Sequence, residues 1–356
     1  MTLIKFELML FLLVGILSLG SQAAFVFNNC PEYSPTPFPV FHIWDEEHDS
    51  DLAIPTCQTA EDLSSVYFDI ISFTSTFPVR RVFVSSNPAT FSMGPSNTLF
   101  IAPRKIIRDH VQSLWATKVL FAHELGHGVF NELIREDWPL YDQFIKDDLE
   151  IMVQGDKFFK SWEKVDQLKT DILNLHLPED EALINKIKDE INKISNEQKT
   201  LTDLIEDLNN KMIKNKMYLQ LRSIISPYHE FFADLVGIFY ANNPQAMYLA
   251  LTYNGIDLEL DNNAKAMDFT IDHPVETWND SEVHNLLAPT RYFVWENFLQ
   301  DNMNTIDKLN FLLKIKDAIY LSARKRYDSE STSNITSTVV NINKDFIQSI
   351  KYIFNF

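Results

Sequence analysis

A long run of apolar residues at alternating four- and three-residue steps is the feature that most limits how this chain can fold. Such spacing is typical of a coiled-coil seam, in which two helices bury a narrow apolar stripe against each other. The seam positions are Ile187, Ile191, Ile194, Gln198, Leu201, Ile205, Leu208 and Met212, with Gln198 as the one polar member.

A second segment upstream of this run has the same spacing, which predicts a partner helix. Its apolar positions are Val165, Leu168, Ile172 and Leu175. Between the two segments, Pro178 cannot continue a helix, so the chain is expected to reverse over residues 176–180. We predict an antiparallel coiled-coil hairpin over residues 157–217, with a second arm about 55 Å long at 1.5 Å per residue. The hairpin either binds a partner protein or packs only on itself or the core.

The first residues have the layout of a secretory signal peptide. Lys5 precedes an apolar run from Leu8 to Leu19, and small residues follow at Ala23 and Ala24, near which cleavage is expected. The protein is therefore predicted to be exported, either secreted or periplasmic, with no stable membrane span in the mature chain. The alternative is an uncleaved anchor, although the run is shorter than the roughly 20 residues that a spanning helix needs.

Composition narrows the class of protein. The 356 residues include 31 Lys and Arg against 49 Asp and Glu, which gives a net charge of −18, so a basic nucleic-acid-binding surface is not expected. Hydrophobic residues make up 46% of the chain, enough for a large core. Cys30 and Cys57 are the only cysteines, and in an exported protein they are predicted to form a disulfide. Two buried thiols are the alternative.

Outside the hairpin, the sequence predicts an α+β domain that is predominantly helical. Residues 79–84 and 98–102 are strand-like and are separated by turn-forming Asn-Pro and Gly-Pro pairs, whereas residues 25–60 have no clear period and are interpreted as an irregular arm. Helical periodicity runs from residue 111 to about 132. A second helix is expected to start at Ser226-Pro227, as an N-cap followed by a first-turn proline, and to end near Tyr240.

Further helices are predicted at 243–252, 290–300, 305–325 and 344–353, and residues 327–336 are predicted to be a polar loop. The hairpin then divides the chain into segments with separate roles. These are the signal peptide (1–24), the arm and first part of a catalytic domain (25–156), the hairpin insertion (157–217) and the second part of the catalytic domain (218–356).

The pentapeptide His123-Glu124-Leu125-Gly126-His127 matches the motif HExxH inside a predicted helix. Residues four apart lie about 40° apart around a helix and one turn along it, so both imidazoles can bind one Zn²⁺. Glu124 lies about 100° around the helix from His123, the position of the general base in zinc peptidases. The alternative is a pair of surface histidines, but the flanking residues 119–122 and 128–130 are apolar, and burying two unpartnered imidazoles would be costly.

A catalytic zinc site needs a third protein ligand and an open position. Glu230 is the best candidate because it lies in an apolar stretch of the second helix, where an unpaired carboxylate is expensive. Alternatively, Glu230 is an ordinary acidic residue near a helix start. Asp234 follows one turn later and is predicted to accept a hydrogen bond from the second ring nitrogen of a ligating histidine.

The combination of HExxH on one helix and Glu-x-x-Ala-Asp on a later helix resembles the gluzincin metallopeptidases, particularly the branch of the CAAX prenyl endopeptidases and HtpX-like proteases. This resemblance implies a zincin-like catalytic domain, with His123, His127 and Glu230 as zinc ligands and Glu124 as the base. It also implies that the strand over residues 98–102 forms the sheet edge on which an extended substrate lies.

Peptide hydrolysis also develops negative charge on the carbonyl oxygen, so a hydrogen-bond donor opposite the metal is useful. Residues 283–291 contain His284 and Arg291 and look distantly like the His-Pro…Arg segment of the same branch. His284 is therefore a catalytic candidate and Arg291 a possible transition-state stabiliser, with His273 as the rival. His229 is expected to be structural.

Together these features predict a secreted metallopeptidase with one Zn²⁺ ion that hydrolyses peptide or protein substrates, with Glu124 as general base. The hairpin is a possible site for a protein partner. The alternative function is a non-catalytic protein whose zinc ion joins two helices while the hairpin binds a partner; its zinc would have four protein ligands.

Overall fold

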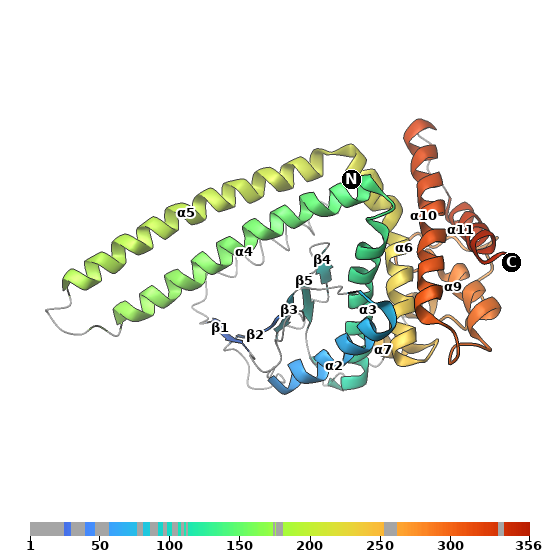
Figure 1. The fold of residues 1–356 in the computed structure, drawn as a ribbon, viewed down its shortest axis with the longest axis horizontal. Coiled ribbons are helices and arrows are strands. Elements are labelled where there is room, and N and C mark those ends of the chain that lie inside the picture. Colours follow the sequence, from blue (N-terminus) through green and yellow to red (C-terminus); the bar gives the residue numbers. More distant parts are fainter. Residues whose placement is uncertain are drawn as a thin grey trace.

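The computed structural model describes the chain as a predominantly helical molecule with a mixed sheet (Figure 1). The described residues are 25–29, 40–46, 57–76, 81–85, 92–94, 98–101, 106–107, 110–111, 113–173, 175, 181–252, 262–333 and 338–356. The signal peptide, the reversal at residues 176–180 and Cys30, hence the proposed disulfide to Cys57, lie outside these residues and stay predictions.

Two helices, α3 (Leu114–Ile134) and α6 (Lys216–Ala241), pack closely against each other and form the centre of the molecule. Almost every residue of α3 from Ala116 to Asn131 is buried, which explains why its apolar residues are not confined to one stripe. α3 begins at Ser113, whose hydroxyl accepts a hydrogen bond from the Ala116 N–H. The helix therefore matches the prediction for residues 111–132 to within a few residues.

Further helices surround this pair. α2 (Cys57–Thr74), α7 (Ala246–Thr252) and α10 (Lys308–Ser333) contact α3 or α6, and α11 (Val339–Phe354) packs on α10. The short helices α8 (Asn262–Ala266) and α9 (Ala288–Val294) follow α7 along the chain, and a π-helical segment, Trp295–Leu299, continues from α9. Among the described residues, no helix is both long enough and apolar enough to cross a membrane.

Five strands form a mixed sheet in the order β1-β2-β3-β5-β4. Three neighbouring strands are parallel, namely β2 (Val40–Glu46), β3 (Arg81–Ser85) and β5 (Thr98–Ile101). The two outer strands, β1 (Phe25–Asn29) and β4 (Ser92–Gly94), are antiparallel to their neighbours. β3 and β5 confirm the two predicted strands, and a separate small sheet joins β6 (Ile106–Ile107) to β7 (His110–Val111).

Two predictions about this region are wrong. Residues 25–60 are not an irregular arm throughout, because they contain β1, β2 and the first turn of α2. β2 has the sequence Val-Phe-His-Ile-Trp-Asp-Glu, which does not alternate polar and apolar residues, so it lacks the period-two signal of a strand. The strand over residues 98–102 is not the sheet edge either, because β4 pairs with it on its outer side.

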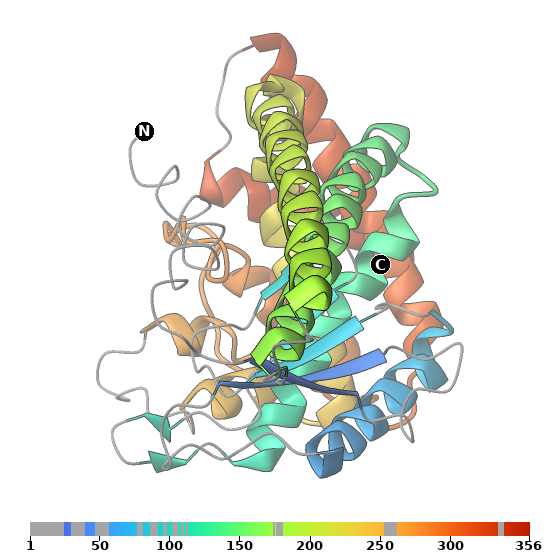
Figure 2. The ribbon, with the colours of Figure 1, turned by 90° about the vertical axis from the view of Figure 1, so that its left-hand side faces the viewer.

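The predicted hairpin is present, formed by α4 (Pro139–Leu173) and α5 (Glu181–Lys214), which pack side by side away from the rest of the molecule (Figures 1 and 2). Every predicted seam position on α5 is buried or half-buried, and the most buried seam residues of the two arms are Ile194 and Val165, 5% and 6% exposed. The first arm begins at Pro139 rather than residue 157, since proline suits the first turn of a helix.

The prediction that the second helix starts at Ser226-Pro227 is wrong. α6 starts at Lys216, capped by the Asn215 side chain, and Pro227 lies inside it. The Ser226 hydroxyl donates to the Arg222 carbonyl one turn back instead of capping a helix. Burial of the residues on both sides of Pro227 stabilises the continuous helix, so packing outweighs the local proline signal.

The polar segment predicted as a loop over residues 327–336 is helical as far as Ser333, where α10 ends. Two ion pairs one turn apart stabilise this polar end, Arg324 with Asp328 and Arg326 with Glu330. Residues 334–337 lie outside the described chain.

Candidate metal centre

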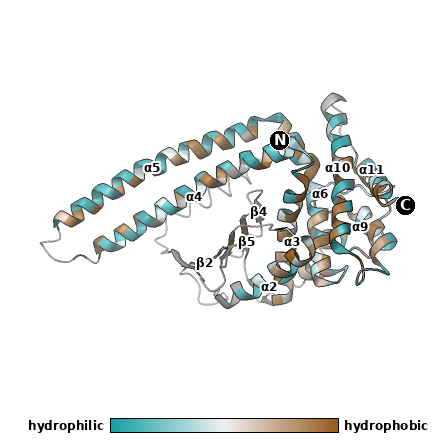
Figure 3. Cartoon of the chain, viewed as in Figure 1, coloured by the Kyte–Doolittle hydropathy of each residue, from teal (hydrophilic) through white to brown (hydrophobic). Residues whose placement is uncertain are grey.

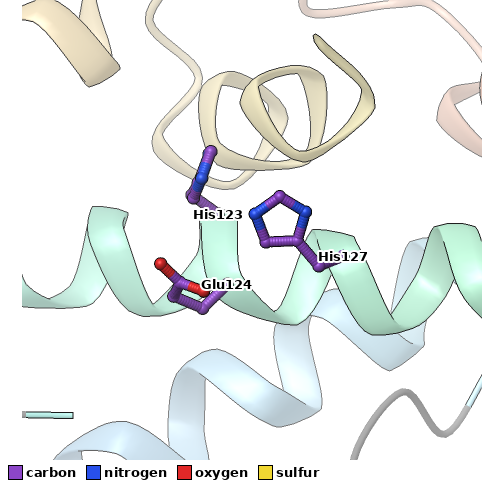
Figure 4. A group of neighbouring side chains, drawn as sticks. All are labelled: His123, Glu124 and His127. Atoms are coloured by element: carbon purple, nitrogen blue, oxygen red, sulfur yellow. The ribbon is translucent and has the colours of Figure 1, made fainter. Parts of the chain in front are cut away.

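The two histidines of the HExxH motif lie one turn apart on α3 and point to the same side, toward α6 (Figure 4). Their ring centroids are 4.8 Å apart, and the side chains of His123 and His127 are each 8% exposed. Glu124 leaves the helix in a different direction (Figure 4). The spacing of the motif therefore gives the arrangement expected from helical geometry.

A glycine in the motif lets α6 approach α3 closely. A Cβ atom on Gly126 would lie 2.7 Å from the Cα of Ala233, which is closer than atoms can approach without a shift. A Cβ atom on a second glycine, Gly237, would lie 3.0 Å from Met247 Sδ and 3.7 Å from the Cβ of His123. The backbone of α3 thus lies directly against the backbone of α6 at Gly126, and Glu230, one turn before Ala233, is brought to the histidines.

One carboxylate oxygen of Glu230 lies close to the Nε2 atoms of both motif histidines. Glu230 Oε2 lies 3.4 Å from His123 Nε2 and 3.6 Å from His127 Nε2, yet this buried oxygen has no hydrogen-bond partner among the described residues. Two ligands that each lie 2.0–2.1 Å from a tetrahedral zinc ion are about 3.4 Å from each other. The two distances, together with the unpartnered oxygen, fit a metal ion held by these three side chains.

The protonation states of Glu230 and His127 also suit ligands. Burial opposes the charged form of Glu230, but the neighbouring His127, His123 and His284 outweigh it and lower the pKa of the carboxyl. Burial lowers the pKa of His127 well below its usual value. A deprotonated carboxylate and a neutral imidazole both have lone pairs available for a metal.

Two carboxylates compete for the third ligand position. Glu124 and the two histidines can place one ligand atom each within 4.8 Å of one another, so Glu124 is also close enough to approach a shared ion. Glu230 fits the third position better, because one of its oxygens lies at ligand–ligand distance from both Nε2 atoms. With Glu230 in that position, Glu124 would lie next to a bound ion but outside its ligand set.

Asp234 lies beside the second ring nitrogen of His123, where the sequence predicts it, with Asp234 Oδ1 2.9 Å from His123 Nδ1. Burial lowers the pKa of His123, but its contacts with Asp234 and Glu230 outweigh burial and raise it well above the usual value. The carboxylate is almost fully buried. His123 therefore has its two ring nitrogens between two carboxylates, an arrangement typical of a ligating histidine.

Arg291 differs from its predicted role as a transition-state stabiliser. Its side chain is fully buried, and both Nε and Nη2 donate to Asp234 Oδ2, with the Nε contact at 2.8 Å. The guanidinium thus binds one carboxylate oxygen of Asp234, Oδ2, while the other, Oδ1, lies beside His123. We therefore correct the prediction and assign Arg291 to positioning Asp234.

His284 reaches the site from the turn before α9. Its Nε2 lies 3.5 Å from Glu230 Oε2, and its Nδ1 lies 2.8 Å from Glu282 Oε1. Glu282 also accepts the backbone N–H groups of His284 and Asn285, so the turn is built around this carboxylate. Sequence reasoning missed Glu282; a carboxylate two residues before a candidate histidine was the available signal.

The other histidines do not face the site in the same way. His229 Nε2 lies 3.1 Å from the His127 carbonyl oxygen, and its ring is tilted against the His127 ring and edge-on to Phe130, which agrees with a structural role. His273 lies beside Trp278, and its Nε2 is 3.4 Å from the Lys265 carbonyl oxygen. The structure therefore favours His284 over its rival His273 for a role at the site.

Comparisons of the chain with protein-family models, with curated proteins and with solved structures find no match. The function must therefore be inferred from the chemistry of the site.

Proposed function

We propose that the protein is an exported zinc metallopeptidase with one Zn²⁺ ion held by His123, His127 and Glu230. The single observation that carries this proposal is the convergence of the two Nε2 atoms on one unpartnered Glu230 oxygen, with Glu124 beside them. A buried His₂Glu set is the ligand combination of catalytic zinc in peptidases, whereas structural zinc sites are dominated by cysteine. Both cysteines of this chain lie far from the motif in sequence.

The arrangement of the sheet supports a zincin-like catalytic domain. β4 is an outer strand, runs antiparallel to β5 and is in contact with α3, which carries the motif. Among the described strands none pairs with the outer side of β4, and an extended peptide that pairs there would lie beside the HExxH helix. The substrate-binding edge that the family resemblance implies for residues 98–102 is therefore proposed at Ser92–Gly94 instead.

Bound zinc would supply Lewis-acid polarisation of the scissile carbonyl and would make the attacking water more acidic. Glu124 accepts the proton of that water and transfers it to the leaving amine. His284, when protonated, can donate from Nε2 to the carbonyl oxygen as charge develops there, while Glu282 holds Nδ1. Asp234 and Arg291 keep His123 in one orientation throughout.

The test of this proposal is the variant Glu124→Gln, assayed with a peptide library and mass spectrometry. We expect peptide cleavage to fall by about 10²–10⁴-fold, because the general base is lost, with zinc content and melting temperature unchanged. Glu132→Gln, on the same helix but away from the site, is the matched control. Retained cleavage in Glu124→Gln would overturn the mechanism.

The second candidate function is a non-catalytic zinc protein that binds a partner through the hairpin of α4 and α5. One observation favours it: a third imidazole, that of His284, lies at ligand–ligand distance from Glu230. Four protein ligands would close the coordination sphere. Peptide cleavage that depends on Glu124 would support the peptidase, whereas zinc binding without peptide cleavage would support the non-catalytic protein.

A further inference from the structure

His123 and His284 have matching surroundings although they come from different parts of the chain. In each residue, Nδ1 lies within 2.9 Å of a carboxylate oxygen, that of Asp234 for His123 and that of Glu282 for His284. In each, Nε2 lies about the same distance from Glu230 Oε2, 3.4 Å and 3.5 Å. A carboxylate on one ring nitrogen and a metal on the other is the usual environment of a ligating histidine.

The Glu282 contact fixes which nitrogen of His284 carries the lone pair. An ionised carboxylate only accepts hydrogen bonds, so Nδ1 of His284 must be the N–H donor. In the neutral imidazole, Nε2 then has a lone pair and no proton. A nitrogen in this state can bind a metal but cannot donate a hydrogen bond, so the neutral form of His284 has the chemistry of a ligand.

We propose that His284 is a fourth protein ligand of the zinc ion in the resting protein and that it is the exchangeable one. This inference rests on the proposed metal site of His123, His127 and Glu230. The distances from Glu230 Oε2 to the three Nε2 atoms, 3.4, 3.6 and 3.5 Å, all match the spacing of ligands around a tetrahedral zinc ion.

The exposure of the ligands explains why His284 is the one that leaves. The His284 side chain is 41% exposed, against 8% for His123 and 17% for Glu230. His284 lies in a turn, whereas the other three ligands lie on the packed helices α3 and α6. A substrate can thus reach the metal position from the His284 side without disturbing the helices, and it must displace this imidazole to do so.

The test is X-ray absorption at the zinc edge, which counts imidazoles from their characteristic scattering. The unmodified mature protein, loaded with one equivalent of zinc, is compared with His284→Ala and with the matched control His273→Ala. We expect three imidazoles per zinc in the unmodified protein and in His273→Ala, and two in His284→Ala. Zinc competition with a chromophoric chelator should show the Kd of His284→Ala raised by about tenfold or more, the lower range for losing a group that supports a metal.

Two imidazoles per zinc in the unmodified protein would overturn the four-ligand proposal and leave the three-ligand site intact. Failure of the unmodified protein to bind zinc would overturn both proposals. The count in the unmodified protein is decisive by itself, so it does not depend on whether His284→Ala folds.

Discussion

The hairpin of α4 and α5 and the helix pair of α3 and α6 are both two-helix contacts, but they are held together differently. The hairpin has a narrow seam whose most buried residues are about 5% exposed, with polar residues on its other faces (Figure 3). α3 and α6 meet through glycine and alanine backbone, and most of their residues are buried. The hairpin is stabilised by apolar side chains along its seam, whereas the close α3–α6 contact requires that Gly126 have no side chain. The same glycine-to-alanine change is therefore expected to have opposite effects on stability in the two regions.

The largest effect is expected from Asp234→Ala, because it leaves Arg291 buried without its charge partner. We expect the free energy of unfolding to fall by about 3–5 kcal/mol, the usual cost of breaking a buried ion pair from one side. Chemical denaturation would measure it. The control is Asp328→Ala, which breaks an exposed ion pair with Arg324 and should change stability little. Equal effects of the two variants would contradict the buried role of Arg291.

The same substitution at two glycines compares the two regions directly. Gly126→Ala should lower stability by about 1–3 kcal/mol, because its Cβ would overlap the Ala233 backbone and push α6, with Glu230, away from the histidines. Gly155→Ala, on α4, meets no atom within 4 Å and should raise stability by up to about 1 kcal/mol through helix propensity. Thermal unfolding and zinc affinity measure both. A stabilised Gly126→Ala variant would show that the helices are not in close contact.

A smaller effect is expected at the polar seam position of the hairpin. Gln198 has a buried side-chain nitrogen without a hydrogen-bond partner. Gln198→Leu should therefore raise stability by about 1 kcal/mol, since it removes an unsatisfied polar group and completes the seam. Zinc binding should not change, because the seam lies outside the metal centre. Lower stability in this variant would mean that the amide has a role in register that the seam model omits.

The smallest effect is expected from Glu190→Gln, which removes an ion pair between the two arms. Glu190 and Lys164 are 2.6 Å apart, but both side chains are largely exposed. Such pairs are screened by salt and contribute little. The melting temperature at physiological salt should be unchanged, and a clear drop would show that charge pairing, rather than the seam, sets the alignment of the arms.

Features encoded within a few turns of one helix could be predicted from the sequence. The seam positions and the paired imidazoles of His123 and His127 follow from helical periodicity alone. Glu230 and Asp234 were found because an acidic residue in an apolar helix is costly without a partner.

Features decided by long-range packing could not be predicted from local signals. Ser226-Pro227 has the local signature of a helix start, and nothing nearby in sequence shows that the helix is buried on both sides of Pro227. The position of Arg291 depends on Asp234, 57 residues away, and the order of the strands depends on which strand pairs outside β5. Glu282 acts through His284, so its role is visible only once His284 is placed beside Glu230.

The continuity of the helices gives the hairpin a direct link to the metal centre. The first arm, α4, follows α3 after a turn at residues 135–138, and the second arm, α5, is separated from α6 only by Asn215. The first arm thus follows the helix that carries His123 and His127, and the second arm precedes the helix that carries Glu230. Each arm of the hairpin is therefore joined by a short connection to a helix that carries a proposed metal ligand.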